Sequence, residues 1–128
     1  MKILVADDDA IILKLLTRIL TQAGQTVIPV SDGVSACAAA EAEHLDLAIV
    51  DLLLPKRDGY AVLMHLRSRT ATRDLPIFLL SSELREEHEA TALALGAQGL
   101  LSKPMKMEDL KGAIRLASEV CAKGGARS

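Results

Sequence analysis

The sequence predicts an α/β domain built on a doubly wound, five-stranded parallel sheet in strand order 2-1-3-4-5. Three observations support this prediction. The apolar pattern changes five times from a strand-like run to a helical period. The strand-like runs are continuously apolar, as expected for strands that helices cover on both faces. The second run contains Pro29, which lacks the N–H that a central strand needs, and this strand order places strand 2 at an edge.

Each predicted strand is short and stops at polar residues. The first stops at three consecutive aspartates, and the second at a Ser-Asp-Gly turn. The third stops at Asp51, and the fourth at two serines. The fifth is followed by Ser102, Lys103 and Pro104. The predicted strands are residues 3–6, 26–30, 47–50, 77–80 and 100–101.

Helical spacing of apolar side chains, together with capping residues, predicts five helices. Gly24 and Gly96 follow the first and fourth of them, at the position where glycine commonly ends a helix. Asp58 precedes the third helix and can cap its first backbone N–H groups. The last helix has an apolar stripe from Met107 to Cys121. The predicted helices are residues 10–23, 33–42, 60–69, 83–95 and about 107–121.

The 128 residues of the chain match the usual size of one domain, and half of them are apolar. We assign residues 1–122 to this domain. Residues 123–128, which are rich in glycine, are expected to form a flexible C-terminal tail. Cys37 and Cys121 both fall inside helical patterns, and we expect free thiols, as in a reducing cytosol.

The charge pattern argues against two classes of partner. The formal net charge is −2, and acidic and basic residues are mixed along the chain. A nucleic-acid surface or a polybasic membrane anchor would need clustered lysine and arginine. No apolar run approaches the roughly 20 residues that span a bilayer, and a strand-like run that begins at residue 3 leaves no room for a signal peptide. We therefore expect a cytoplasmic protein with no direct contact to nucleic acid or membrane.

Polar side chains at the strand ends indicate a functional site. Asp7 and Asp8 follow strand 1, Asp51 ends strand 3, Ser81 ends strand 4 and Lys103 follows strand 5. The carboxyl ends of parallel strands meet at one edge of the sheet, where such folds bind ligands. Crowded carboxylates resist ionising together unless a cation compensates them. Oxygen ligands with room for water suit Mg²⁺.

Each of these residues alone has an ordinary structural explanation. An aspartate or a serine after a strand often caps the next helix, and a Lys-Pro pair is often a turn. Asp51 is harder to explain this way, because an unpaired carboxylate at the end of a buried strand is costly to desolvate. Their occurrence together at the strand ends of one fold favours a real site.

The sequence resembles the receiver domains of two-component response regulators from Lys2 to about Ala122. The resemblance implies the flavodoxin-like receiver fold, and a cis bond before Pro104. The matching segments are ILVADDD at residues 3–9, IVDLLLP at 49–55, DG at 58–59, PIFLLSS at 76–82, GA at 96–97 and KP at 103–104.

The resemblance also implies a role for each site residue. Asp51 accepts a phosphoryl group, and Asp8, Asp51 and the carbonyl of Leu53 bind Mg²⁺ directly. Asp7 acts on the metal mainly through water. The other two residues contact the phosphoryl group, by a hydrogen bond from the hydroxyl of Ser81 and by an ion pair with Lys103.

The partners follow from the same resemblance. The phosphoryl donor is a sensor histidine kinase or a phosphotransfer protein, and a downstream protein target reads the phosphorylated state. A homodimer through the face of helix 4, strand 5 and helix 5 is also expected. The chemistry is one stoichiometric transfer followed by slow self-dephosphorylation, so we do not classify the protein as an enzyme.

Departures from the family pattern leave alternatives open. The family often has Tyr or Phe on strand 5 three residues before the lysine, where this chain has Leu100. That difference supports a docking module that phosphorylation does not regulate. A third reading is a Mg²⁺-dependent phosphatase, but such enzymes carry a second acid two residues after the first, where this chain has Leu53. The first two turns of residues 83–95 offer only Leu84 to the core, and we hypothesise that this helix moves with Ser81.

Overall fold

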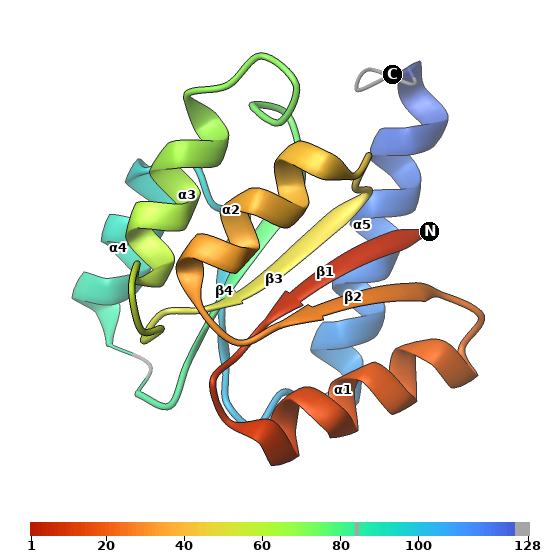
Figure 1. The fold of residues 1–128 in the computed structure, drawn as a ribbon, viewed down its shortest axis with the longest axis horizontal. Coiled ribbons are helices and arrows are strands. Elements are labelled where there is room, and N and C mark those ends of the chain that lie inside the picture. Colours follow the sequence, from red (N-terminus) through yellow and green to blue (C-terminus); the bar gives the residue numbers. More distant parts are fainter. Residues whose placement is uncertain (84, 125–128) are drawn as a thin grey trace.

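The computed structural model describes residues 1–83 and 85–124, and its five strands and five helices alternate along this part of the chain (Figure 1). The strands are β1 (Lys2–Ala6), β2 (Thr26–Val30), β3 (Leu47–Asp51), β4 (Ile77–Ser81) and β5 (Gly99–Ser102). The helices are α1 (Ala10–Gln22), α2 (Gly33–Ala42), α3 (Gly59–Arg67), α4 (Glu86–Ala94) and α5 (Met107–Gly124).

The strands form one parallel sheet in the order β2-β1-β3-β4-β5, which confirms the predicted topology. Pro29 lies in β2 at the edge of the sheet, opposite Val5 of β1. The proline therefore removes no hydrogen bond from the sheet interior, which is the physical reason that the sequence placed this strand at an edge.

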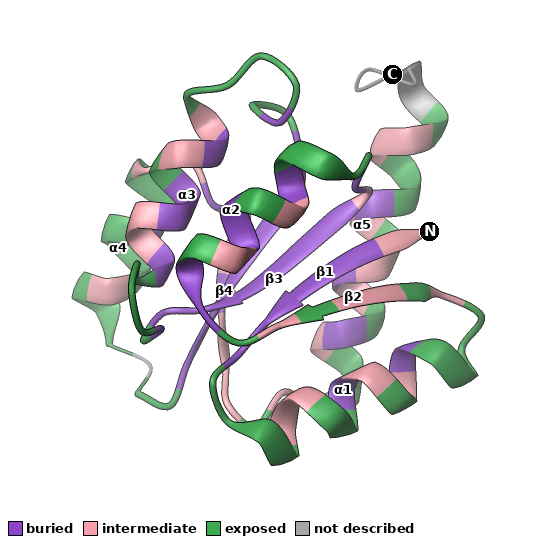
Figure 2. Cartoon of the chain, in the orientation of Figure 1, coloured by how far each residue is buried: buried purple, intermediate pink, exposed green. Residues whose placement is uncertain are grey.

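Helices cover both faces of the sheet, so the domain has three layers. α2, α3 and α4 lie on one face, and α1 and α5 lie on the other (Figure 1). Successive side chains of each central strand enter opposite cores: Leu4 packs with α2 and α3, whereas Ile3 and Val5 pack with α1 and α5. All five residues of β3 are buried, as Figure 2 shows for the centre of the sheet. Burial on both faces explains why these strands are continuously apolar.

Two helix boundaries differ from the prediction by about three residues, and the others agree more closely. The helix predicted over residues 83–95 begins only at Glu86, because both backbone groups of Glu83 are hydrogen-bonded to the hydroxyl of Ser81 and not to a helix. Leu84, which was expected to hold its first turns to the core, lies outside the described residues. α5 continues to Gly124, so the tail predicted from residue 123 is wrong for its first two residues. The rest of that tail, residues 125–128, also lies outside the described part.

The capping residues behave as predicted. Asp58 caps α3 by accepting a hydrogen bond from the Ala61 N–H at 2.9 Å. Gly24 and Gly96 follow α1 and α4 with φ of +88° and +104°, a left-handed conformation that favours glycine. Cys37 is a free thiol, as expected, and the thiol of Cys121 donates a hydrogen bond to Asp46 Oδ1 at 3.3 Å.

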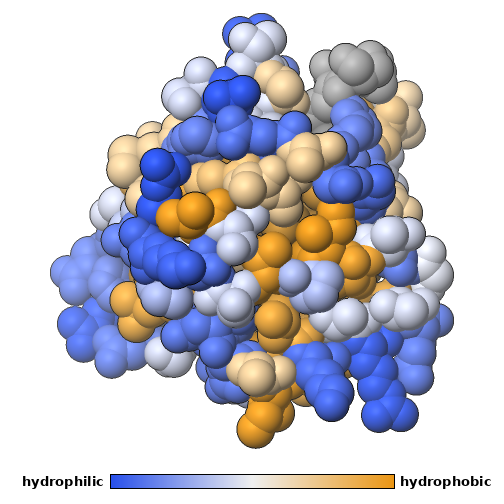
Figure 3. Space-filling model, in the orientation of Figure 1, coloured by the Kyte–Doolittle hydropathy of each residue, from blue (hydrophilic) through white to orange (hydrophobic). Residues whose placement is uncertain are grey.

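On the face that Figure 3 shows, apolar side chains gather across the middle between α1 and α2, and hydrophilic side chains surround them. Among the large apolar residues that the structure describes, Ile11 and Leu53 are the most exposed, with 80% and 72% of their surface accessible. Within the described residues, no helix is both long and apolar enough to cross a membrane.

Candidate functional site

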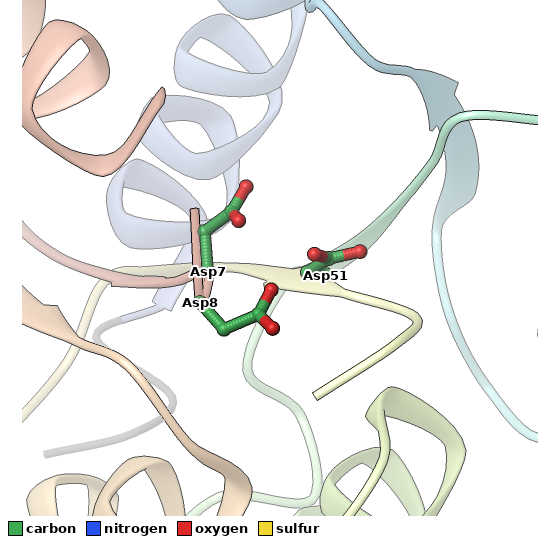
Figure 4. Close-up of side chains that lie close together, drawn as sticks. All are labelled: Asp7, Asp8 and Asp51. Atoms are coloured by element: carbon green, nitrogen blue, oxygen red, sulfur yellow. The ribbon is translucent and has the colours of Figure 1, made fainter. Parts of the chain in front are cut away.

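The structure brings the predicted site residues to one end of the sheet. Asp51 and Ser81 are the last residues of β3 and β4, and Asp7 and Lys103 directly follow β1 and β5. The carboxylates of Asp7, Asp8 and Asp51 form a triangle around a shared space (Figure 4). One oxygen from each lies within 4.8 Å of the others, and this is the acidic cluster that the described residues offer to a cation.

The three carboxylates differ in burial, and burial affects the pKa of Asp7. Asp7 and Asp51 are buried, whereas Asp8 is exposed. Burial raises the pKa of Asp7 above its ordinary value, and repulsion from Asp51 adds to the rise. Hydrogen bonds from the Asp9 amide and from Lys103 partly oppose it. The hydrogen bond from Lys103 and its positive charge therefore favour the ionised form of Asp7.

One oxygen of Asp7 has no hydrogen-bond partner in the described part of the chain. Its Oδ1 accepts from the Asp9 amide at 2.8 Å and from Lys103 Nζ at 3.0 Å. Its Oδ2 is buried and accepts no hydrogen bond from the described residues. A buried polar atom without a partner is costly, and a bound water or ion is a usual explanation. A carboxylate oxygen in this position is suited to contact a metal ion through a bound water molecule.

Lys103 joins the two buried carboxylates. Its Nζ lies 2.7 Å from Asp51 Oδ2 and 3.0 Å from Asp7 Oδ1, and its side chain is only 14% exposed. Burial lowers the pKa of the Lys103 ammonium, but the hydrogen bonds to Asp51 and Asp7 outweigh this effect and the pKa is raised. One ammonium cannot balance three carboxylates. The pocket retains excess negative charge, and its oxygen ligands suit Mg²⁺.

The second oxygen of Asp51 faces the loop that follows β3. Asp51 Oδ1 accepts a hydrogen bond from the Leu53 amide at 3.3 Å. The loop is anchored on both sides, because the Leu52 amide donates to the Leu80 carbonyl and the Gly59 amide donates to the Leu52 carbonyl, each at 2.8 Å. The backbone next to Asp51 is therefore held by β4 and by the start of α3.

Ser81 reaches the site edge but has other partners in this state. Its hydroxyl donates to the Glu83 carbonyl at 2.7 Å and accepts from the Glu83 amide at 3.1 Å. The hydroxyl therefore holds the β4–α4 loop, and a bond to a group on Asp51 would require it to release the Glu83 carbonyl. The peptide bond between Lys103 and Pro104 is cis, as the resemblance implied.

One contributor to the site was missed from the sequence. A Cβ on Gly59 would lie 2.6 Å from the Asp51 carbonyl oxygen, so only glycine lets α3 begin this close to the site. The pair Asp58-Gly59 carried the signal, but from the sequence we assigned a cap to Asp58 and gave Gly59 no role beyond the match to the family. The close approach of two backbones depends on tertiary packing, which the pair alone does not specify.

Comparisons with known proteins agree with this geometry. The sequence profile described as "Response regulator receiver domain" matches residues 3–115. The alkaline phosphatase synthesis transcriptional regulatory protein PhoP of Bacillus subtilis is 37% identical over 114 residues, which are 89% of this chain and 47% of that protein. A probable transcriptional regulator of Porphyridium aerugineum is 38% identical over 89% of this chain and 46% of its own length. The chain thus spans slightly less than half of these relatives.

Solved structures show the same likeness over nearly their whole length. A chemotaxis response regulator of Vibrio cholerae has a TM-score of 0.84 and 29% identity, with 91% of this chain and 97% of that chain covered. The receiver domain of a sensor histidine kinase of Pseudomonas aeruginosa, which holds a magnesium ion in its active-site cleft, has a TM-score of 0.83 and 27% identity over the same shares of the two chains. The sequence match, the strand order and the fold agree, and the chain belongs to the response regulator receiver domain family.

Proposed function

We propose that the protein is the phosphoacceptor switch of a two-component phosphorelay in the cytoplasm. A sensor histidine kinase or a phosphotransfer protein donates a phosphoryl group to Asp51, and a downstream protein target reads the change in surface. The observation that supports this most directly is the pairing of buried Asp51 with Lys103 at 2.7 Å beside two further carboxylates.

Asp51 is the nucleophile in this proposal. A carboxylate oxygen of Asp51 forms a bond to phosphorus while the bond from phosphorus to the donor histidine nitrogen breaks, and the electron pair of that bond stays on the imidazole. Negative charge gathers on the transferred oxygens, and Lys103 is already placed to neutralise it. Lys103 contacts Asp7 and Asp51 at the same time before transfer, so it can keep its bond to Asp7 while it neutralises this charge.

Asp8, Asp51 and the Leu53 carbonyl are the proposed direct ligands of Mg²⁺, and Asp7 acts through water. The unpartnered Asp7 Oδ2 and the excess of carboxylate over ammonium support this assignment. When bound, Mg²⁺ supplies the second positive charge that a phosphoryl group approaching carboxylates needs. The exposed position of Asp8 leaves this ligand open to solvent and to an incoming donor.

The switch in this proposal is an exchange of partners by Ser81. A phosphoryl oxygen on Asp51 competes with the Glu83 carbonyl for the Ser81 hydroxyl. Release of Glu83 frees the loop that leads into α4, whose N-cap Arg85 makes no side-chain capping bond and whose buried residue is Ala92. Weak attachment favours movement of this helix. Homodimer formation through α4, β5 and α5 stays a prediction.

Intact-mass measurement with acetyl phosphate tests the proposal. We expect a Mg²⁺-dependent phosphate adduct on the wild-type protein and none on Asp51→Asn. Asp58→Asn is the matched control, because asparagine also caps a helix and Asp58 lies outside the acidic cluster. An adduct that persists on Asp51→Asn would show that another residue accepts the phosphoryl group. Loss of the adduct on Asp58→Asn would mean that an Asp→Asn change prevents phosphorylation by destabilising the protein.

Leu100 supports one alternative, a docking module that phosphorylation does not regulate. Its side chain is buried in the core that contains α2, α3 and α4, and it has no hydroxyl to exchange between partners. Under this alternative the wild-type protein forms no adduct and binds no Mg²⁺. The same mass experiment, with a Mg²⁺ titration beside it, therefore separates the two functions.

A further inference from the structure

The loop that carries Leu53 rests on the start of α2 through three consecutive residues. The Gly33 amide donates to the Pro55 carbonyl at 3.2 Å. Lys56 Nζ lies 3.8 Å from Asp32 Oδ2, and Arg57 Nη1 donates to Cys37 Sγ at 3.6 Å. Backbone, ion-pair and side-chain contacts thus join the same two segments.

The two backbones are also packed against each other. A Cβ on Gly33 would lie 2.0 Å from the Arg57 carbonyl oxygen and 2.5 Å from the Arg57 Cβ. No side chain fits there without moving the loop. Leu54 is buried in the same core as Cys37, so the loop is also attached to the hydrophobic core.

The loop adopts a conformation that needs this support. Lys56 has φ of +69°, which is uncommon for a residue with a side chain, and the Arg57 amide closes the turn on the Pro55 carbonyl at 2.8 Å. Such backbone persists where surrounding contacts hold it in place. Here the contacts that hold the turn at Lys56 are those that Pro55, Lys56 and Arg57 make with α2 and its N-cap.

We infer that the start of α2 positions the metal-binding backbone of the site, and that Arg57 is a positioning residue for Mg²⁺. Leu53 lies between Asp51, which accepts its amide hydrogen bond, and the residues that α2 holds. Arg57 attaches the part of the loop that follows Leu53 to α2, and this attachment holds the Leu53 carbonyl in one place relative to Asp51. This inference rests on the proposed function, because it concerns the Mg²⁺ site of that proposal.

The variant Arg57→Met tests the inference, because charge and position predict opposite results. Loss of a positive charge near a cation site would tighten Mg²⁺ binding. Loss of positioning weakens it, and we expect a dissociation constant about 10-fold higher, the lower end for residues that orient metal ligands. NMR titration of the Leu53 and Asp51 amides with Mg²⁺ measures this. Arg69→Met is the matched control, since Arg69 pairs with Glu41 at the far end of α2 at 3.1 Å.

Phosphorylation kinetics provide a second readout that general destabilisation would not produce. For Arg57→Met we expect the Mg²⁺ concentration for half-maximal phosphorylation by acetyl phosphate to rise about 10-fold, with the rate at saturating Mg²⁺ unchanged. Cys37→Ala, which removes the acceptor and no charge, should shift the Mg²⁺ requirement in the same direction. This second variant keeps the test valid if Arg57→Met does not fold.

Each outcome decides the inference. Mg²⁺ affinity that is unchanged or tighter in both variants would overturn the positioning role and leave the proposed function intact. Weaker affinity in Arg69→Met as well would show that the effect is not specific to the loop, and would also overturn it. A wild-type protein that binds no Mg²⁺ would overturn the proposed function, and the positioning role with it.

Discussion

Gly59→Ala is the substitution whose effect the structure determines most sharply. An alanine Cβ at this position would lie 2.6 Å from the Asp51 carbonyl oxygen and 2.8 Å from the Leu52 Cα. Both atoms belong to the backbone, so no side-chain rotation relieves the overlap. The start of α3 and the end of β3 must move apart.

The cost can be worked out from the contacts that change. Overpacking of this kind costs about 1–3 kcal/mol. The hydrogen bond from the Gly59 amide to the Leu52 carbonyl, 2.8 Å long, is strained by the same movement and is worth about 1 kcal/mol. Alanine recovers about 0.5–1 kcal/mol through its better helix propensity. We expect a net loss of about 2 kcal/mol in the free energy of unfolding.

Gly112→Ala is the matched control. Gly112 lies inside α5, and a Cβ there would point into open space. The same change should therefore stabilise the protein by about 0.5–1 kcal/mol. Urea denaturation followed by circular dichroism measures both variants, and the two free energies of unfolding should differ by about 3 kcal/mol.

The two variants also differ in their effect on function. Movement of the Asp51 backbone should lower the rate of phosphorylation by acetyl phosphate in Gly59→Ala, even where the protein is fully folded, and Gly112→Ala should react like the wild type. Equal stability of the two variants would refute the reasoning, because it would show that the chain relieves the overlap at no cost.

Further predictions concern the acidic pocket, one buried hydroxyl and one cap. Lys103→Met leaves Asp7 and Asp51 without their cation and should lower the free energy of unfolding by about 3 kcal/mol in EDTA, with partial recovery in excess Mg²⁺; equal loss with and without Mg²⁺ would argue against a metal at this site. Thr72→Val removes a buried hydroxyl that donates to the Leu66 carbonyl at 2.6 Å and should cost about 1 kcal/mol. Thr91→Val, which loses a similar but exposed bond to the Glu87 carbonyl, should cost less, and the reverse order in urea denaturation would contradict this view. Hydrogen bonds from the Ser35 amide and hydroxyl lower the pKa of Asp32, so its stabilising effect is present at neutral pH and is lost as the pH falls from about 4, its value in an unfolded chain, through the lower folded value. Asp32→Asn keeps the cap and should lack this part of the acid dependence, which a denaturation series across that pH range would reveal.

The sequence by itself determined the features that depend on local chemistry. The change from continuous apolar runs to helical spacing located all five strands and helices, because a strand inside the sheet is buried on both faces and a covering helix on only one. Pro29 determined that β2 lies at an edge, since proline cannot donate to a neighbour on that side. Asp7, Asp8, Asp51 and Lys103 could be grouped because parallel strands bring their carboxyl ends to one edge of a sheet.

Only the tertiary structure decided how these parts meet. The hydroxyl of Ser81 could donate a hydrogen bond to a group on Asp51 or to its own loop. In this structure it donates to the Glu83 carbonyl, and α4 begins only at Glu86. Gly33 looked like a turn residue and Gly59 had no structural role assigned to it, but backbone atoms of another segment occupy the space that a Cβ would need at each position. A sequence pattern reports which face of an element is buried. It does not report how closely two backbones approach or which of several acceptors a hydroxyl uses, because these depend on the packing of the whole domain.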